Sequence, residues 1–150
     1  MLKLYAFVTC DRVITDTEGQ TSLIGLFNEL TVVLMDPMAQ PPGDAVAARD
    51  WAIFTSWEKS SEDDGKEFHQ DIQLLYPDGT PFSPEMDYPF VILADKRFQN
   101  VIAKSRGFPI GKPGRYTISM KLRSNGITIF GPVEIWIDIK YGSAPANPPS

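Results

Sequence analysis

The chain has 150 residues, of which 43% are hydrophobic, 22% are charged and 11% are aromatic. This composition excludes wholesale disorder, and the length fits a single domain that can fold without a metal ion or a disulfide. The net charge of −5 argues against attraction of the whole molecule to nucleic acid or to an anionic membrane.

The first half of the chain contains five segments with the composition of β-strands. They span residues 4–9, 22–27, 30–35, 51–57 and 68–76. The first is nearly all apolar, as expected of a central strand that is covered on both faces. In the last, Phe68, Ile72 and Leu74 alternate with polar residues, which indicates a half-buried strand. Before the fourth strand, a Pro-Pro-Gly sequence blocks a helix, so residues 45–48 can form one helical turn at most.

Four more strands are predicted in the second half, at residues 88–93, 98–103, 115–123 and 127–141. Asn125 and Gly126 lie between the last two, and Asn-Gly between alternating runs is the strongest short signal for a hairpin. Short strands at this spacing predict an all-β fold: a single antiparallel β-sandwich, immunoglobulin-like or related, with about eight or nine strands. We expect the sandwich to span residues 1–142, followed by a flexible tail at residues 143–150.

Three short segments carry a resemblance to known proteins. Cys10 and Asp11 end the first strand, Ser22–Phe27 (Ser-Leu-Ile-Gly-Leu-Phe) forms the second, and Pro113–Tyr116 opens the last hairpin. In this order they resemble a family of small bacterial β-sandwich proteins of unknown function, and the last hairpin resembles that of immunoglobulin-like domains. The resemblance covers nearly the whole chain. It implies the fold and a bacterial source, and it adds no site residue.

Cys10 is the only cysteine, which excludes an intrachain disulfide and favours a reducing, cytoplasmic location. A catalytic thiol needs a neighbour that lowers its pKa, but Asp11 beside it raises the pKa, and His69 lies on the polar side of another strand. We therefore expect Cys10 to be a small buried side chain and Asp11 to cap a turn. One histidine and one cysteine are also too few ligands for a zinc site. The sequence favours a protein without catalytic residues, a metal ion or another cofactor.

Carboxylates provide the one enzymatic alternative, a carboxylate-dependent hydrolase. It requires that at least two of five side chains converge: Asp11, Asp36, Asp50, Glu62 and Asp64. The acidic segment 62–67 also invites a calcium site, but its spacing matches no calcium loop, and we expect a solvated loop.

The charges are segregated along the chain. Residues 1–95 hold 17 acidic and 5 basic residues, a net charge of −12, whereas residues 96–133 hold 8 basic residues and no acid. The candidate binding residues are Lys104, Arg106, Arg115, Lys121, Arg123 and Trp136. Basic groups beside an exposed aromatic ring can bind a carboxylate, a phosphate or a base. The alternative is that acidic strands neutralise these positions through cross-strand pairs.

These features predict a non-enzymatic binding or assembly module that acts through protein–protein contacts, with self-association into a homodimer through a sheet edge or face. Binding of a ligand or of nucleic acid by the basic hairpin, residues 104–123, is the alternative, although the acidic segment 1–95 disfavours nucleic acid. No membrane partner is expected, because the apolar run after Lys3 is too short for a signal peptide or a membrane span.

Overall fold

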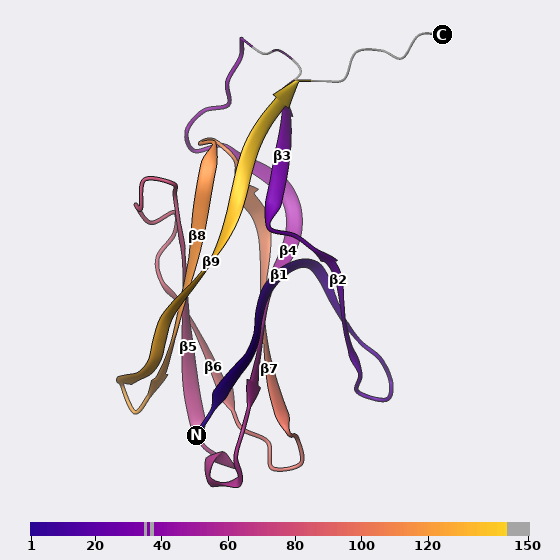
Figure 1. The fold of residues 1–150 in the computed structure, drawn as a ribbon, viewed down its shortest axis with the longest axis vertical. Helices are drawn as coiled ribbons and strands as arrows, with labels where there is room; N and C mark the ends of the chain where they lie inside the picture. Colours follow the sequence, from indigo (N-terminus) through magenta and orange to yellow (C-terminus); the bar gives the residue numbers. More distant parts are fainter. Residues whose placement is uncertain (35, 37, 144–150) are drawn as a thin grey trace.

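The computed structural model of the protein describes residues 1–34, 36 and 38–143. They form nine strands (Figure 1): β1 (Lys3–Thr15), β2 (Thr21–Leu26), β3 (Glu29–Leu34), β4 (Val46–Glu58), β5 (Glu67–Leu75), β6 (Met86–Val91), β7 (Phe98–Pro109), β8 (Gly114–Ser124) and β9 (Ile127–Ser143). The only helix in this described part is a short 3-10 turn, η1 (Ser61–Asp63), and no helix there is long and apolar enough to cross a membrane. Met35, which ends the third predicted strand, and the predicted tail beyond Ser143 lie outside the described residues.

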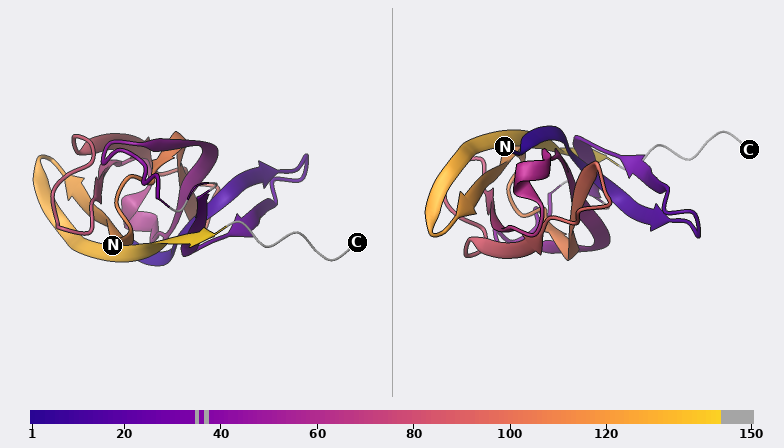
Figure 2. Two further views of the ribbon diagram at one scale, coloured as in Figure 1. Left: turned by 90° about the horizontal axis from the view of Figure 1, so that it is seen from above. Right: turned by 90° about the horizontal axis from the view of Figure 1, so that it is seen from below.

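The strands form two sheets that face each other, which confirms the predicted β-sandwich. One sheet has four strands in the order β2-β1-β4-β7, and the other has five in the order β3-β9-β8-β5-β6. Neighbouring strands are antiparallel, except that β3 runs parallel to β9. Figure 2 shows the sandwich along its long axis, from above and from below.

The chain passes from one sheet to the other at Phe27 and Asn28, between β2 and β3. The Phe27 N–H donates to the carbonyl of Thr9 in β1 at 3.2 Å, and the Asp138 N–H of β9 donates to the carbonyl of Asn28 at 2.9 Å. Because these two residues bond to different sheets, they close one seam of the sandwich. Away from this crossing, residues 3–8 of β1 have only β4 as a described strand neighbour, and residues 127–137 of β9 have only β8.

The strand that is buried on both faces is β4, and not the first strand as predicted. All residues from Trp51 to Trp57 are buried. Residues 4–8 of β1 are partly buried or exposed, because this part of β1 has a described strand neighbour, β4, on one side only. Residues 45–48, for which the sequence allowed one helical turn at most, form no helical turn. Val46 begins β4 opposite Pro109, because the β7 backbone takes up the hydrogen bonds of this segment.

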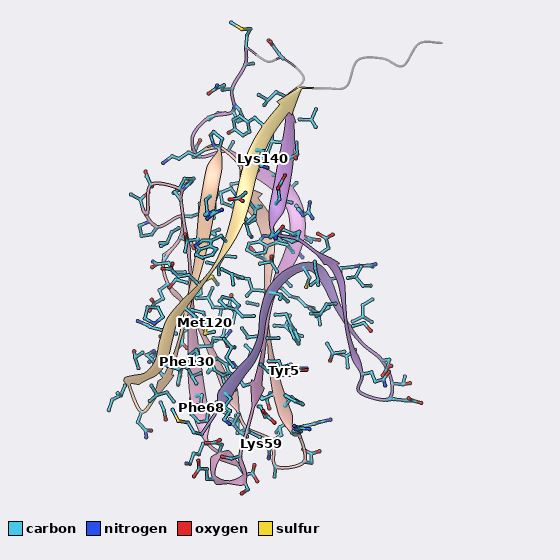
Figure 3. All side chains as sticks on the ribbon, viewed as in Figure 1. Tyr5, Lys59, Phe68, Met120, Phe130 and Lys140 are labelled. Carbon is cyan, nitrogen blue, oxygen red and sulfur yellow. The ribbon has the colours of Figure 1, made fainter. Side chains whose placement is uncertain are left out.

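The apolar core between the sheets contains a buried amide, Gln70 of β5, which is fully shielded from solvent. Its Oε1 accepts hydrogen bonds from Thr55 Oγ1 and from Trp57 Nε1, both at 2.9 Å. Thr55 and Trp57 lie on β4 of the other sheet, so this one oxygen ties the two layers together. Apolar side chains such as Phe68 and Met120 form the core in which Gln70 is buried (Figure 3).

Replacing Gln70 by alanine should lower the free energy of unfolding by about 2–4 kcal/mol, because the buried Trp57 N–H loses its acceptor and the smaller side chain leaves a cavity. The Thr55 hydroxyl can still donate to the carbonyl of Val101 at 3.2 Å. Urea unfolding followed by tryptophan fluorescence measures this change. Gln73→Ala, on a partly exposed position of the same strand, is the control and should cost less than about 0.5 kcal/mol. Equal losses in the two variants would contradict the role of the Gln70 oxygen.

Candidate functional site

The six candidate binding residues lie on two different faces of the sandwich. Four lie on the outer face of the five-stranded sheet: Arg115, Lys121 and Arg123 on β8, and Trp136 on β9. Lys104 and Arg106 lie on β7, on the outer face of the four-stranded sheet. The structure does not bring all six together, because β7 and β8 follow each other in the chain but belong to opposite sheets.

Acidic neighbours neutralise the three cations of β8. The ion pairs join Arg115 to Asp138 (3.1 Å), Lys121 to Glu85 (3.3 Å), and Arg123 to Asp71 and Asp87. Arg115 also lies over the ring of Trp136, with its guanidinium carbon 5.3 Å from the ring centroid. On this face the cross-strand pairs considered from the sequence are present, so an anion that binds here has to compete with four carboxylates.

His69 of β5, the only histidine of the chain, lies on this same face. Its Nδ1 lies 2.9 Å from Asp87 Oδ1, and its Nε2 lies 2.9 Å from Glu67 Oε1. The hydrogen bond with Asp87 raises the pKa of His69 above its ordinary value of 6.5. Because the folded state holds the proton more tightly than the unfolded chain, the resulting stabilisation is fully present below pH 6.5 and is lost as the pH rises through the folded pKa.

The imidazole resonances of this single histidine should titrate with a midpoint above 6.5 in an NMR pH series. Asp87→Asn should lower the midpoint, because the amide carries no charge that favours the imidazolium. Asp44→Asn, in the exposed loop before β4, is the control and should leave it unchanged. A midpoint at or below 6.5 in the wild type would contradict the effect of Asp87.

β1 and β2 continue beyond the four-stranded sheet as a two-stranded hairpin. β1 pairs with β4 up to Cys10, and from Cys10 to Thr15 it pairs with β2 instead. Residues 10–26 therefore leave the sheet together and are termed the arm. The arm stands off from the rest of the sandwich at the right of Figure 1 and in both views of Figure 2. A two-stranded hairpin has little stability of its own, so contacts at its base are needed to hold it.

Asp11 and Arg49 hold the base of the arm. The guanidinium of Arg49 on β4 forms an ion pair with the carboxylate of Asp11 on β1, and its central carbon lies 4.8 Å from the ring centroid of Phe27. Gly25 leaves room for this carboxylate, since a Cβ there would lie 2.2 Å from Asp11 Oδ2 and the backbone φ is +71°. Asp11 does not cap a turn as expected, because its carboxylate is taken by a side chain of the neighbouring strand.

Arg49→Leu should loosen the arm while the sandwich stays folded. Amide hydrogen exchange in residues 21–26 should become faster by about tenfold or more, because the arm loses an ion pair and a cation–ring contact. Exchange in β5 and β8 should change much less. Arg97→Leu, which breaks the exposed pair with Glu58, is the control. Unchanged exchange in the arm of Arg49→Leu would show that other contacts hold it.

A cleft of about 460 Å³ lies between the arm and the outer face of β4 and β7. Its lining includes Arg12 from the arm, Asp50 and Ala52 from β4, and Lys104 and Arg106 from β7. Two of the candidate residues, Lys104 and Arg106, therefore do share a site, and Arg12 joins them there. The sequence did not indicate Arg12 as a binding residue, because Arg12 is far from Lys104 and Arg106 in the chain and belongs to the net acidic segment 1–95. The one signal for it in the sequence is its position beside the end of the first predicted strand.

The cysteine and the histidine do not form a catalytic pair. Cys10 is fully buried in β1 of the four-stranded sheet, as expected, whereas His69 lies on the outer face of the other sheet. Burial, together with the charge of Asp11, raises the pKa of the Cys10 thiol. Within the described ranges of the chain, no group of three or more His, Cys, Asp or Glu side chains could hold a metal ion.

Of the five carboxylates proposed for a hydrolase, only Asp11 and Asp50 line the same cleft. Asp36 lies in the loop after β3, at one end of the molecule (Figure 1). Glu62 and Asp64 lie at η1, between β4 and β5, at the other end. Asp11 is already paired with Arg49, so the cleft holds one carboxylate without an ion-pair partner among the described residues.

The fold and its surfaces define a two-sheet β-sandwich with a projecting arm. The sequence profile of DUF6941, a family of unknown function, matches residues 5–128, and the chain belongs to this family. The matched range includes the arm, β4 and β7, and it ends at the start of β9, before Trp136. No curated protein matches the chain.

Proposed function

We propose that the protein is a non-enzymatic assembly module that acts through protein–protein contacts, and that its partner at the arm is a second copy of the same chain. The observation that carries the proposal is the open edge of β2, which has a strand neighbour on one side only in the described sheets. An open strand edge presents a row of free N–H and C=O groups to which another strand can bind.

Most other open edges of the sandwich carry features that hinder strand addition. β6 contains Pro89, β9 contains Pro132 at an irregularity in its ladder with β8, and β7 carries Lys104 and Arg106. Proline and charged side chains are the means by which β-proteins avoid pairing edge to edge. The edge of β3 faces the start of β4 across a cleft that Arg49 lines. Residues 3–8 of β1, which also lack a second strand neighbour in the described sheets, begin with the exposed Lys3. We therefore place strand addition at β2.

β2 has no proline and no charged side chain, although Gly25, with a φ of +71°, departs from extended backbone at one position. Residues 19–28 contain no charged side chain and no proline. Ile24 and Leu26 are 39% and 62% exposed, and Ile14, opposite Ser22 in β1, is 43% exposed on the same face of the arm. An uncharged edge with exposed aliphatic side chains is a surface that favours association with another strand.

A second copy fits this edge because the strand is complementary to itself. Two β2 strands that pair antiparallel about a two-fold axis near Ile24 place aliphatic side chains beside one another. The net charge of −5 on each chain opposes close approach, but none of it lies on the contact strand. Pairing also supplies the third strand that a two-stranded arm needs for stability.

An apolar cleft of about 410 Å³ continues this surface at the end of β2. Leu26 and Phe27 line it together with Trp136 of β9, whose side chain is half exposed. Trp136, a candidate binding residue from the sequence, thus lies next to the end of the open edge. A second copy seated on β2 can cover this aromatic ring as well.

Size-exclusion chromatography with light scattering, at micromolar concentration, tests the dimer. The wild type should have twice the monomer mass of 16.7 kDa. Ile24→Lys should weaken self-association by roughly tenfold or more, because a charge replaces an apolar side chain in the contact. Ile127→Lys, at a position of β9 that is 67% exposed, is the matched control and should remain dimeric.

Circular dichroism verifies that each variant is folded. A monomeric wild type, or a folded Ile24→Lys variant that dimerises as well as the wild type, would show that the β2 edge is not the contact.

A further inference from the structure

The cleft between the arm and β7 gathers cations that lack ion-pair partners. Eight of the fourteen Lys and Arg residues form ion pairs. The other six have no carboxylate within 4.0 Å among the described residues: Lys3, Arg12, Lys66, Lys96, Lys104 and Arg106. Arg12, Lys104 and Arg106 line this one cleft, and Lys96 lines a neighbouring cleft beside the tip of the arm. Most of the cations without an ion-pair partner among the described residues therefore lie beside the arm.

These three cations surround a small apolar floor. Ala52 of β4 is almost fully buried and lies opposite Lys104 in the ladder with β7, and Asp50 lies opposite Arg106. Arg12 belongs to the arm, which forms the other wall of the cleft. Because the alanine side chain ends at Cβ, it does not fill the space between the longer side chains around it.

The acidic groups of the cleft leave it with an excess of positive charge. The carboxylate of Asp11 is held by Arg49. Asp50 forms no ion pair within 4.0 Å with any described residue, despite its place opposite Arg106. Three cations therefore face one uncommitted carboxylate. The remaining lining residues include Val13 and Ile14 of the arm and Trp51 of β4.

We propose that this cleft binds a small ligand that carries an anionic group, a phosphate or a carboxylate, on an apolar body. The guanidinium groups of Arg12 and Arg106 offer the paired N–H donors that match both anions. The volume of about 460 Å³ lies in the range of small-molecule sites, and the apolar lining suits the body of the ligand. The cleft is formed by one chain, so the proposal does not depend on the dimer.

NMR titration of the ¹⁵N-labelled protein tests the site with three probes that share an aromatic ring: phenyl phosphate, phenylacetate and the uncharged benzyl alcohol. At least one of the two anions should shift resonances of residues 11–14, 50–52 and 104–106, and benzyl alcohol should not. The anion that binds more tightly identifies the anionic group. Binding of neither anion, shifts confined to other residues, or equal shifts with benzyl alcohol would overturn the proposal.

A charge-matched pair of double variants separates a built site from general attraction. Arg12→Gln/Arg106→Gln should weaken binding of the anion by about tenfold or more. Lys3→Gln/Lys66→Gln removes the same charge from two exposed residues outside the cleft and should bind as the wild type does. Equal weakening in both would show that net charge alone attracts the anion. Light scattering on the same samples keeps the two proposals apart, since a monomeric chain that binds the anion overturns only the dimer.

Discussion

The contact between Asp11 and Arg49 holds the arm at the point where it diverges from the four-stranded sheet. It lies where β1 stops pairing with β4 and continues with β2 alone. The arm is held there by one ion pair, one cation–ring contact with Phe27 and the space that Gly25 leaves for the carboxylate. The open edge of β2 and the cleft beside β7 both lie beyond this point, where the arm has diverged from β4. Asn100 of β7 still donates a hydrogen bond of 3.4 Å to Thr21 of the arm there.

The two outer faces of the molecule use their cations in different ways. On the five-stranded sheet, acidic residues of β5, β6, β9 and the segment just before β6 pair with Arg115, Lys121 and Arg123. On the four-stranded sheet, Lys104 and Arg106 have no such partners among the described residues. The net charge of −5 is therefore an average over a neutralised face, several acidic loops and one cleft with positive charge.

Most of the fold could be predicted from the sequence, because a period of two and strong turn signals mark strands locally. The nine strands and the Asn125-Gly126 hairpin follow from these signals. Periodicity gives the two faces of one strand but not the sheet to which the strand belongs, so Lys104 and Arg106 could not be separated in advance from the cations of β8. For the same reason the sequence does not show that Arg12 shares their cleft. The pairing of Asp11 with Arg49, residues far apart in the chain, likewise depends on where β1 diverges from β4.

The parallel pairing of β3 with β9 constrains the order in which the chain can fold. Glu29 lies opposite Asp138, so this ladder joins segments that are separated by most of the sequence. Such a contact carries a large loop-closure cost and forms late, after the local hairpins. During synthesis, β3 has to wait for β9 to emerge, and the uncharged segment that precedes it stays accessible throughout that interval. During that time neighbouring nascent chains and chaperones can reach this uncharged segment.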